Sequence, residues 1–416
     1  MNVHVPTRRG LLATAAGFGL SLQVVAVPAM AADPDLARRK VIVVICRGGM
    51  DGLAVAPPIG DPDYRALRGI LALNDAALPL DATFGLHPSL AATHALAKAG
   101  EARIAPAIAT PDRARSHFEA QDVLETGAGG VYGATSGWLN RAVDALSAHR
   151  KVEALSVGAT APLILRGKAQ AASWSPGRAV DAQARLPGLL QDLYRNDPLL
   201  GPALARGLAT ETLAQSAMAA MGPEAPNMTA APPQPGATPQ ARQQQGREAA
   251  RELGRTLAGF MREPAGPQVA ALSLDSFDTH ANQGAAQGQL AVRLSYLDGV
   301  LDGIHTGLGP EWKNTVVLVA TEFGRTARVN GTGGTDHGTA STALLLGGAL
   351  KPGGIIGDWP GLKAQALFEG RDVAPTLDMR GLFKGVLADH MGLDRTVLET
   401  VVFPGSAAAR PVAALV

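Results

Sequence analysis

The chain has 416 residues, of which 46% are apolar and 18% charged, so it can build a large core and wholesale disorder is excluded. Lysine and arginine number 37 against 36 acidic residues, and the resulting net charge of +1 argues against a basic nucleic-acid-binding protein. The 4% aromatic content argues against base-stacking surfaces. The single cysteine, Cys46, excludes an intrachain disulfide and a cysteine-rich zinc module.

The first 32 residues have the pattern of an export signal. Two arginines at 8 and 9 precede an apolar stretch at 10–27, and Ala-Met-Ala at 29–31 matches a cleavage site. The order Thr-Arg-Arg-Gly-Leu-Leu at 7–12 is typical of a twin-arginine signal. The alternative is a membrane anchor, but alanine, glycine and polar residues make the stretch a poor permanent span. We therefore expect a periplasmic or secreted protein with no membrane anchor after cleavage.

Short β-branched apolar runs alternate with helical patterns along the rest of the chain. The first run, 41–46, is wholly apolar and typical of a strand buried on both faces of a parallel sheet. The other predicted strands are 104–109, 152–157, 161–165, 268–274, 315–320 and 341–346. The predicted helices are 88–98, 116–125, 137–148, 186–194, 247–261, 287–304 and 378–390. This alternation predicts an α/β fold with a mainly parallel sheet.

A low-complexity segment interrupts this alternation. Residues 222–246 contain six prolines and the run Gln-Gln-Gln. Such a composition predicts a flexible surface insertion rather than a domain boundary, because the strand pattern resumes after it. We expect a single α/β domain over 33–416.

Two pairs of metal-ligating residue types lie in loops near predicted strands. Asp278 and His280 follow the strand at 268–274, and Asp336 and His337 lie in a glycine-rich loop. Carboxylates with neutral imidazoles suit zinc or another divalent ion such as manganese. Each pair alone is also explained as an ordinary turn, since aspartate favours such positions. Together, at the edge where parallel strands end, they predict a metal or catalytic site.

Three further charged residues follow predicted strands. Asp51 comes after the most clearly buried strand and is interpreted as a ligand rather than a turn residue. With Asp51, the two pairs would suffice for a two-metal site, in which the ions lie about 3.5–4 Å apart. Glu322 is a candidate ligand, and Arg325 either holds an anionic substrate or pairs with Glu322.

Ser116 stands at the start of the predicted helix at 116–125. As a helix N-cap with Glu119 three residues on, it would form a capping box, which by itself explains the pattern. The alternative is catalytic: a helix N-terminus favours anions, Arg115 precedes it, and the Ser116 hydroxyl would be a metal-activated nucleophile. Both interpretations stay open at this stage.

The remaining histidines give weaker signals. His87 precedes a helix and is interpreted as structural. His390 ends a helix, where a cation complements the dipole, but it is kept as a spare metal ligand.

Seven short segments and the twin-arginine leader occur in a specific order. The segments are Cys-Arg-Gly-Gly-Met-Asp-Gly-Leu (46–53), Gly-Leu-His-Pro (85–88), Arg-Ser-His-Phe (115–118), Ser-Gly-Trp-Leu-Asn-Arg (136–141), Phe-Asp-Thr-His-Ala-Asn-Gln (277–283), Thr-Glu-Phe-Gly-Arg-Thr (321–326) and Gly-Thr-Asp-His-Gly (334–338). In this order they resemble an exported bacterial family known as domain of unknown function 1501. The resemblance spans nearly the whole chain after the leader, and the segment at 222–246 is an addition to the pattern.

That family is similar, more distantly, to the alkaline phosphatase and sulfatase superfamily. The resemblance implies a three-layer sandwich whose central sheet is mixed and mainly parallel, and hydrolysis of phosphate or sulfate esters with one or two metal ions. It implies a nucleophile at Ser116. The metal ligands that it implies are Asp51, Asp278, His280, Asp336 and His337.

Two departures from the superfamily pattern leave two hypotheses. Asp278 and His280 are spaced D-x-H where alkaline phosphatases have D-x-x-x-H, and a third late histidine has no clear counterpart. The leading hypothesis is an exported hydrolase with one or two zinc, manganese or calcium ions. Its substrate would be a small-molecule or polymeric phosphate or sulfate ester, with Arg115 and Arg325 stabilising the developing charge.

The alternative is a non-catalytic periplasmic binding or assembly protein that keeps the fold and one metal. The segment at 222–246 would then tether a protein partner. A redox enzyme is disfavoured, because the sequence has neither a dinucleotide fingerprint nor cysteine ligands for an iron–sulfur cluster. No nucleic-acid partner is expected under any of these hypotheses.

Overall fold

The main sheet of the protein contains most of the predicted strands. The computed structural model describes residues 34–148, 152–157, 161–174, 238–263 and 266–416, with isolated residues between 193 and 208. Within these ranges the sheet has eight strands in the order β10-β4-β9-β8-β1-β7-β5-β6. They are β1 (Lys40–Cys46), β4 (Ala102–Ala109), β5 (Ala154–Val157), β6 (Ala171–Trp174), β7 (Val269–Leu274), β8 (Thr315–Ala320), β9 (Ser341–Leu346) and β10 (Leu377–Asp378). A separate two-stranded sheet pairs β2 (Leu78–Pro79) with β3 (Gly85–Leu86).

The main sheet is mixed and mainly parallel, as expected. Strand β1 lies parallel between β7 and β8, and β5 lies parallel between β7 and β6. Strand β9 is antiparallel to both of its neighbours, β4 and β8. All seven residues of β1 and all six of β8 are buried, which is the environment that long β-branched runs favour.

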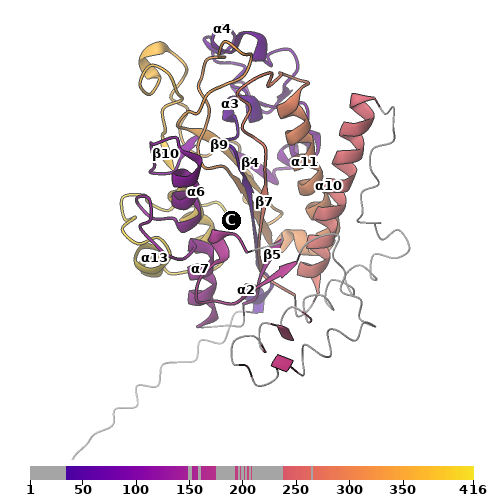
Figure 1. Ribbon diagram of the computed structural model, residues 1–416, viewed down its shortest axis with the longest axis vertical. Coiled ribbons are helices and arrows are strands. Elements are labelled where there is room, and N and C mark those ends of the chain that lie inside the picture. Colours follow the sequence, from indigo (N-terminus) through magenta and orange to yellow (C-terminus); the bar gives the residue numbers. More distant parts are fainter. Residues whose placement is uncertain are drawn as a thin grey trace, which may run out of the picture. The chain divides into compact units, whose positions relative to one another are not determined.

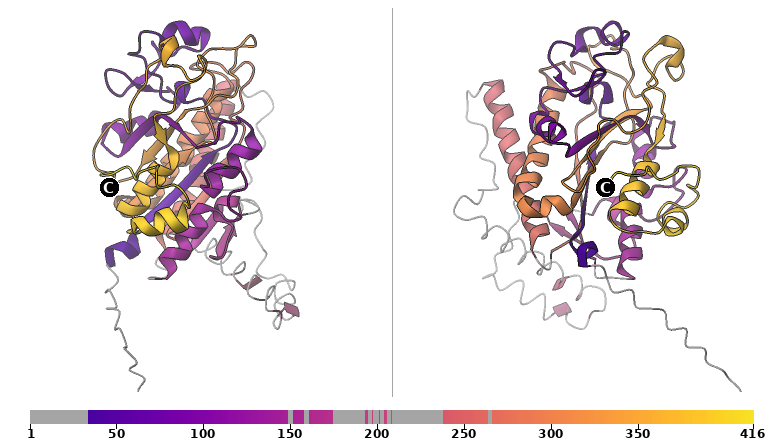
Figure 2. Two further views of the ribbon diagram at one scale, coloured as in Figure 1. Left: turned by 90° about the vertical axis from the view of Figure 1, so that its left-hand side faces the viewer. Right: turned by 180° about the vertical axis from the view of Figure 1, so that it is seen from behind.

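Helices cover both faces of this sheet (Figure 1; Figure 2). Ile42 and Val44 of β1 pack into a core with α5, α10 and α11, whereas Val41 and Val43 point to the opposite face and pack with α6, α7 and α12. The sheet therefore has an apolar core on each side, which confirms the three-layer α/β sandwich. The helices are α2 (Pro34–Arg38), α3 (Gly52–Val55), α4 (Tyr64–Arg68), α5 (Ala91–Lys98), α6 (His117–Thr126), α7 (Trp138–Ser147), α10 (Pro239–Arg262), α11 (Gln289–Leu308), α12 (Met379–Asp389) and α13 (Arg395–Val397).

Two sequence-based expectations were wrong in detail. The strand expected at 161–165 is instead a short 3-10 helix over Leu163–Leu165, which follows Pro162. The low-complexity segment was expected to be flexible up to residue 246, but α10 begins at Pro239. The Thr238 hydroxyl caps this helix by accepting from the Ala241 amide at 3.2 Å, and the proline occupies the first turn, where its missing N–H costs nothing.

Three expectations fall wholly or largely outside the described residues. They are the leader at 1–32, the helix at 186–194 and the part of the insertion before residue 238. Among the described helices, none has the length and apolarity needed to cross a bilayer.

The topology brings several loops to one edge of the sheet. Parallel strands β1, β7 and β8 all end there, and so does β4, because it is antiparallel to β9, which itself runs antiparallel to β8. The antiparallel strand β9 begins at this edge, so the glycine-rich loop before it joins the loops that follow the other strands. This is the edge at which α/β proteins build their sites.

Candidate metal centre

Three histidine rings face one carboxylate at this edge. His117 is the first residue of α6, Asp278 and His280 lie in the loop after β7, and His337 lies in the loop before β9. The Nε2 atoms of His117, His280 and His337 lie 3.3, 3.1 and 3.3 Å from carboxylate oxygens of Asp278. The Nε2 atoms of His280 and His337 lie 3.0 Å apart. We call these four residues the histidine cluster.

The opposite nitrogen of two of the rings is bound to an acceptor. Nδ1 of His117 donates to Oε1 of Glu322 at 2.8 Å, and Nδ1 of His337 donates to the carbonyl oxygen of Arg115 at 2.8 Å. A carboxylate or a carbonyl oxygen only accepts, and the Nδ1 contact is the shorter one in both rings, so we assign the proton of the neutral ring to Nδ1. In the neutral ring, Nε2 then presents a lone pair to Asp278.

His280 also has an acceptor behind its ring, at a longer distance. Its Nδ1 lies 3.3 Å from Oδ1 of Asp336, which also accepts from the side-chain amide of Asn330 at 3.0 Å. All three rings therefore have a hydrogen-bond acceptor behind them. Metal-binding histidines have this arrangement in general, because the rear acceptor fixes the tautomer and raises the basicity of the ligand nitrogen.

The spacing of the facing atoms fits a divalent cation. Ligand atoms about 2.0–2.1 Å from a tetrahedral zinc ion lie about 3.3 Å from one another. The Nε2–oxygen separations in the cluster are 3.1–3.3 Å. The candidate ligand atoms of His117, Asp278 and His337 all lie within 4.8 Å of one another. Lone pairs this close repel unless a proton or cation lies between them, so the donor set fits a zinc-type ion.

The electrostatics of the cluster keep both carboxylates ionised and act in opposite directions on two of the rings. The hydrogen bond that His117 donates to Glu322, opposed by partial burial, raises the pKa of His117, whereas burial lowers the pKa of His337. Burial opposes ionisation of Asp278, but the hydrogen bond and charge of Arg325 hold its pKa below the ordinary value. Burial also opposes ionisation of Glu322, and the bond from His117 outweighs it, so its pKa is lowered.

Arg325 pins Asp278 and joins the surrounding loops. It is fully buried, forms an ion pair with Asp278, and donates to the carbonyl oxygens of Gly48, Gly49 and Thr335 at 2.7, 2.7 and 3.0 Å. The expected pairing with Glu322 is therefore wrong: the partner is Asp278, because the guanidinium points toward the β7 loop. Its hydrogen bonds also leave it poorly placed for the expected role in holding an anion.

A glycine makes this packing feasible. Gly48 has φ +115°, and a Cβ at this position would lie 2.5 Å from the backbone nitrogen of Asp278. The loop after β1 can therefore lie directly on the backbone that carries the shared carboxylate only because residue 48 has no side chain.

Two of the expected ligands stand behind histidines. Glu322 is buried, and besides His117 it accepts from the Gly48 amide at 2.8 Å and the Thr321 hydroxyl at 3.0 Å. Asp336 stands behind His280 in the same way. Direct ligation by either carboxylate stays a prediction, and the contacts place both as positioning groups.

Asp51 is not brought into the cluster. It is buried and forms an ion pair with the equally buried Arg68, accepts from the side-chain amide of Gln283 at 2.7 Å, and caps α3 through the Leu53 amide at 3.2 Å. Both of its oxygens are thus occupied by protein donors. Its role as a ligand stays a prediction that these contacts do not support.

The segment around Ser116 contributes differently from the expectation. Ser116 is the N-cap residue of α6, but its hydroxyl makes no capping hydrogen bond, so the expected capping box is absent. The guanidinium of Arg115 is held by Glu369 at 2.6 Å and Asp372 at 2.9 Å. The residue acts on the cluster through its carbonyl oxygen, which fixes His337.

Sequence reasoning missed His117 as a ligand. Its segment was singled out, but for the hydroxyl of Ser116 rather than for the adjacent imidazole. A histidine at the start of a helix that follows a buried strand was the available signal. Arg68 and Gln283, which are the partners of Asp51, carried no comparable signal in the sequence.

The two other histidines that the sequence analysis considered, His87 and His390, have structural positions. His87 is buried, with Nε2 donating to the Ala285 carbonyl oxygen and Nδ1 accepting from the Ser89 amide, which confirms the structural interpretation. His390 donates to the carbonyl oxygen of Lys40 at 3.0 Å. Lys40 is the first residue of β1, at the opposite edge of the sheet, so the expectation of His390 as a spare ligand is wrong.

The chain also matches a known protein family. The model of a family described as protein of unknown function (DUF1501) matches residues 38–402. The chain belongs to this family. A search of curated proteins found no match.

Similar folds occur among solved structures at low identity. A phosphonate monoester hydrolase from Silicibacter pomeroyi is 13% identical, with a TM-score of 0.38, over 90% of this chain and 76% of that one. A phosphonate monoester hydrolase of Agrobacterium radiobacter is 13% identical, with a TM-score of 0.36, over 86% and 74%. An alkaline phosphatase superfamily protein from Vibrio parahaemolyticus is 12% identical, with a TM-score of 0.35, over 77% and 62%. At these scores, any functional argument rests on the geometry of the cluster.

Proposed function

We propose that this DUF1501 member is a metal-dependent hydrolase of phosphate or sulfate esters. The observation that carries the proposal is the convergence of three imidazole Nε2 atoms on the carboxylate of Asp278, each ring being fixed from behind by an acceptor. A purely structural cluster would satisfy its lone pairs with donors. With the ring protons of His117 and His337 on Nδ1, the lone pairs of this cluster face one another, and a bound cation would stabilise that arrangement.

The residues of the cluster would divide the work as follows. His117, His280, His337 and Asp278 would hold one divalent ion, for which zinc, manganese and calcium are the candidates. A bound ion supplies positive charge that polarises an ester oxygen. Arg325 keeps Asp278 ionised and fixed in direction.

Ser116 is the nucleophile that we propose. It directly precedes His117 at the N-terminus of α6, and its hydroxyl is not used as a cap. The amides of the first helical turn favour an anionic group beside it. The acceptors bound to His117 and His337 hold the two rings nearest to this helix end, so the hydroxyl and the cluster keep a fixed relation.

A second candidate is a binding or assembly protein that keeps the metal but has no turnover. The observation that favours it is the engagement of both candidate catalytic arginines. The guanidinium of Arg115 is matched by Glu369 and Asp372, and that of Arg325 by Asp278 and carbonyl oxygens. Under this reading, the expected charge stabilisation by these arginines does not occur.

The first test measures metal content and turnover together. We expect wild type purified from metal-replete cells to hold one or two equivalents of zinc, manganese or calcium, and to hydrolyse 4-nitrophenyl phosphate, its diester or 4-nitrophenyl sulfate. His117→Ala/His337→Ala should lose both properties. The matched control is His94→Ala, which removes a histidine whose Nε2 donates to the Pro79 carbonyl oxygen outside the cluster.

Three outcomes separate the candidates. Metal and turnover that both vanish in the double variant support the hydrolase. Metal without turnover on any ester leaves the binding protein. If the wild type holds no metal, even after incubation with zinc or manganese, both the hydrolase and the metal-keeping binding protein are rejected. Ser116→Ala, which should keep the metal and lose turnover at least 100-fold, tests the nucleophile separately.

Export by the twin-arginine route is part of the same proposal. The leader at 1–32 would deliver a single folded domain over 33–416 to the periplasm or the medium. Replacement of Arg8 and Arg9 by lysine should retain the full-length chain inside the cell. Unchanged export of this variant would contradict the proposal of a twin-arginine route.

A further inference from the structure

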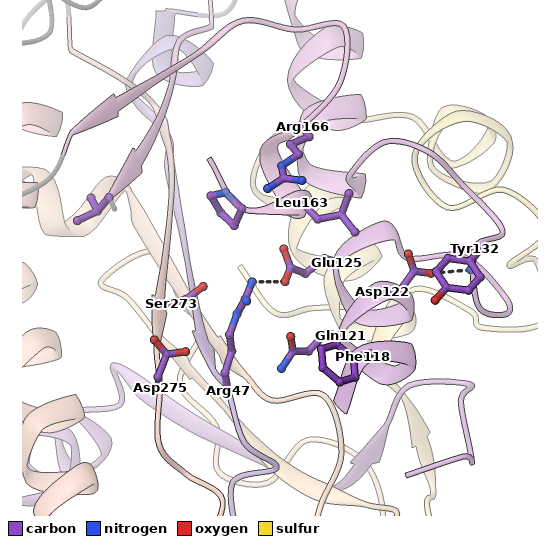
Figure 3. A pocket seen from close by; sticks show the side chains of 12 residues that line it. Arg47, Phe118, Gln121, Asp122, Glu125, Tyr132, Leu163, Arg166, Ser273 and Asp275 are labelled. Carbon is purple, nitrogen blue, oxygen red and sulfur yellow. Dashed lines mark hydrogen bonds and ion pairs between the residues drawn. The ribbon is translucent and has the colours of Figure 1, made fainter. Parts of the chain in front are cut away.

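A pocket of about 550 Å³ lies beside the histidine cluster, against the same helix α6 (Figure 3). Its walls come from α6, the loop after β1, the loop at 162–166 and the end of β7. The charged and amide or hydroxyl side chains in these walls are Arg47, Gln121, Asp122, Glu125, Arg166, Ser273 and Asp275, beside the phenol of Tyr132. None of them belongs to the cluster, and the proposed chemistry does not use them.

The pocket and the cluster share structural elements. Gln121 lies one helical turn after His117, and its amide donates to Oε1 of Glu322 at 3.3 Å, the same oxygen that accepts from His117. Arg47 directly precedes the glycine whose amide donates to Glu322, and Asp275 stands three residues before Asp278. One ligand could therefore occupy the pocket with one part and reach the histidine cluster with another, without a long linker between the two parts.

The charges in the pocket oppose one another. Arg47 forms an ion pair with Glu125, and Figure 3 shows Arg166 reaching toward this pair from the opposite wall while Asp275 lies near Arg47. A polyanion would meet carboxylates here and a polycation would meet guanidiniums. A neutral polyol avoids both penalties, because each hydroxyl donates to a carboxylate and accepts from a guanidinium.

Two buried polar atoms in the pocket wall have no hydrogen-bond partner within the described ranges. They are Nε of Arg47 and Oγ of Ser273. Buried polar atoms are nearly always hydrogen-bonded in proteins, so the wall of the pocket is incompletely paired at these two atoms.

Aromatic rings complete the site. Phe118 and Tyr132 line the pocket and are 86% and 78% exposed, which makes them two of the few large apolar side chains on the described surface. An exposed aromatic ring beside polar hydrogen-bonding groups presents a flat apolar face, on which the C–H face of a sugar ring can pack.

We infer that this pocket binds a neutral saccharide. The inference deepens the proposed function, because the saccharide would be the alcohol part of the ester whose phosphate or sulfate lies at the histidine cluster. Gln121, between the two sites, is a positioning residue: it contacts the saccharide side and holds Glu322 behind His117.

The test measures saccharide binding independently of turnover. Neutral trisaccharides of glucose, galactose and N-acetylglucosamine are titrated against the metal-loaded protein by saturation-transfer NMR and calorimetry. We expect at least one to bind, and Phe118→Ala/Tyr132→Ala and Asp275→Asn each to weaken binding at least tenfold. The matched control is Val292→Ala, which removes an exposed apolar side chain from α11.

The possible results are decisive in both directions. Binding that is lost in the pocket variants but kept in the control, with unchanged metal content, supports the inference. No binding to any trisaccharide, or equal binding by the pocket variants, overturns it, and so does binding of inorganic sulfate that the pocket variants weaken. Saccharide binding by a protein without metal would reject the proposed hydrolase and leave the pocket standing, so the two failures are distinguishable.

Discussion

Two aspartates that follow neighbouring strands of the same sheet have opposite environments. Asp51, after β1, is buried and surrounded by donors: the guanidinium of Arg68, the amide of Gln283 and a backbone N–H. Asp278, after β7, is partly exposed, and apart from Arg325 it faces ring nitrogens that present lone pairs. The sequence gives both residues the same signal, a carboxylate at the end of a buried strand.

The comparison shows how a structural carboxylate differs from a ligand. A buried charge is tolerated when protein donors neutralise it, and its removal then exposes the partner charge. A carboxylate that faces other acceptors destabilises the folded protein locally unless a cation binds between them. The two aspartates should therefore respond differently to the same substitution.

Asp51→Asn should produce the largest loss of stability. The substitution leaves Arg68, which is 0% exposed, without a counter-charge, and breaking such a buried pair costs about 3–5 kcal/mol. Urea unfolding measures the loss, and the metal content of the folded fraction should not change. Adding Arg68→Met should restore much of the stability. A loss of metal without a loss of stability would instead make Asp51 a ligand.

Asp278→Asn should mainly affect metal affinity. The change keeps the shape of the side chain but removes the charge shared by the three rings, and we expect zinc to bind at least 100-fold more weakly, which is about 2.7 kcal/mol. Competition with a chromophoric chelator measures the affinity. Because Arg325 keeps its carbonyl acceptors, unfolding of the metal-free protein should change by less than that of Asp51→Asn. Equal zinc affinity in wild type and Asp278→Asn would contradict the proposal that the histidine cluster binds the metal.

Glu322→Gln should have an intermediate effect on the same affinity. The amide oxygen can still accept from His117, but the charge that raises the basicity of the ring is lost. A change of this kind behind a ligand weakens metal binding about tenfold. Asp336→Asn, behind the more exposed His280, is the matched comparison and should cost less. A complete loss of zinc in Glu322→Gln would show that Glu322 is itself a ligand.

Glu311→Gln should have the smallest effect, because it concerns a partly exposed ion pair at the opposite edge of the sheet. Burial opposes its ionisation, but hydrogen bonds from Lys40 and Arg38 lower the pKa of Glu311 from 4.5 to about 2. The stabilisation is therefore fully present above about pH 4.5 and is lost as the pH falls toward 2. We expect a difference of about 1 kcal/mol between wild type and variant at pH 7, which disappears near pH 2.

The measurement for this prediction is urea unfolding of both proteins from pH 7 to pH 2. Metal affinity should be identical in wild type and Glu311→Gln at every pH. A stability difference between the two proteins that grows as the pH falls would contradict the expected direction of this pH dependence.

The positions of the central strands along the chain, and the edge of the sheet at which their loops meet, were accessible without the structure. The run at 41–46 predicted a strand buried on both faces, and the strands at 315–320 and 341–346 have the predicted bounds. Period and composition suffice here, because burial on both faces requires continuous apolar residues. The loops that carry Asp278 and His337 were also identified, because two pairs of metal-ligating residue types occur together beside such strands.

The role of each side chain in those loops was not accessible. His117 and Asp278 are 161 positions apart, and only the packing of α6 beside β7 brings them together. Whether Glu322 faces the cluster or stands behind His117 depends on the direction of its side chain, and that direction is fixed by the amide of Gly48.

The sequence by itself determined the α/β fold with a mainly parallel sheet, the edge of the sheet at which the histidine cluster lies and most of the residue types gathered there. These properties depend on local period, on composition and on the rule that parallel strands end at one edge. Only the tertiary structure decided that Asp51 is neutralised by Arg68 while Asp278 faces three imidazoles. That distinction depends on which side chains arrive from distant segments, because local sequence does not specify the partners of a carboxylate at the end of a strand.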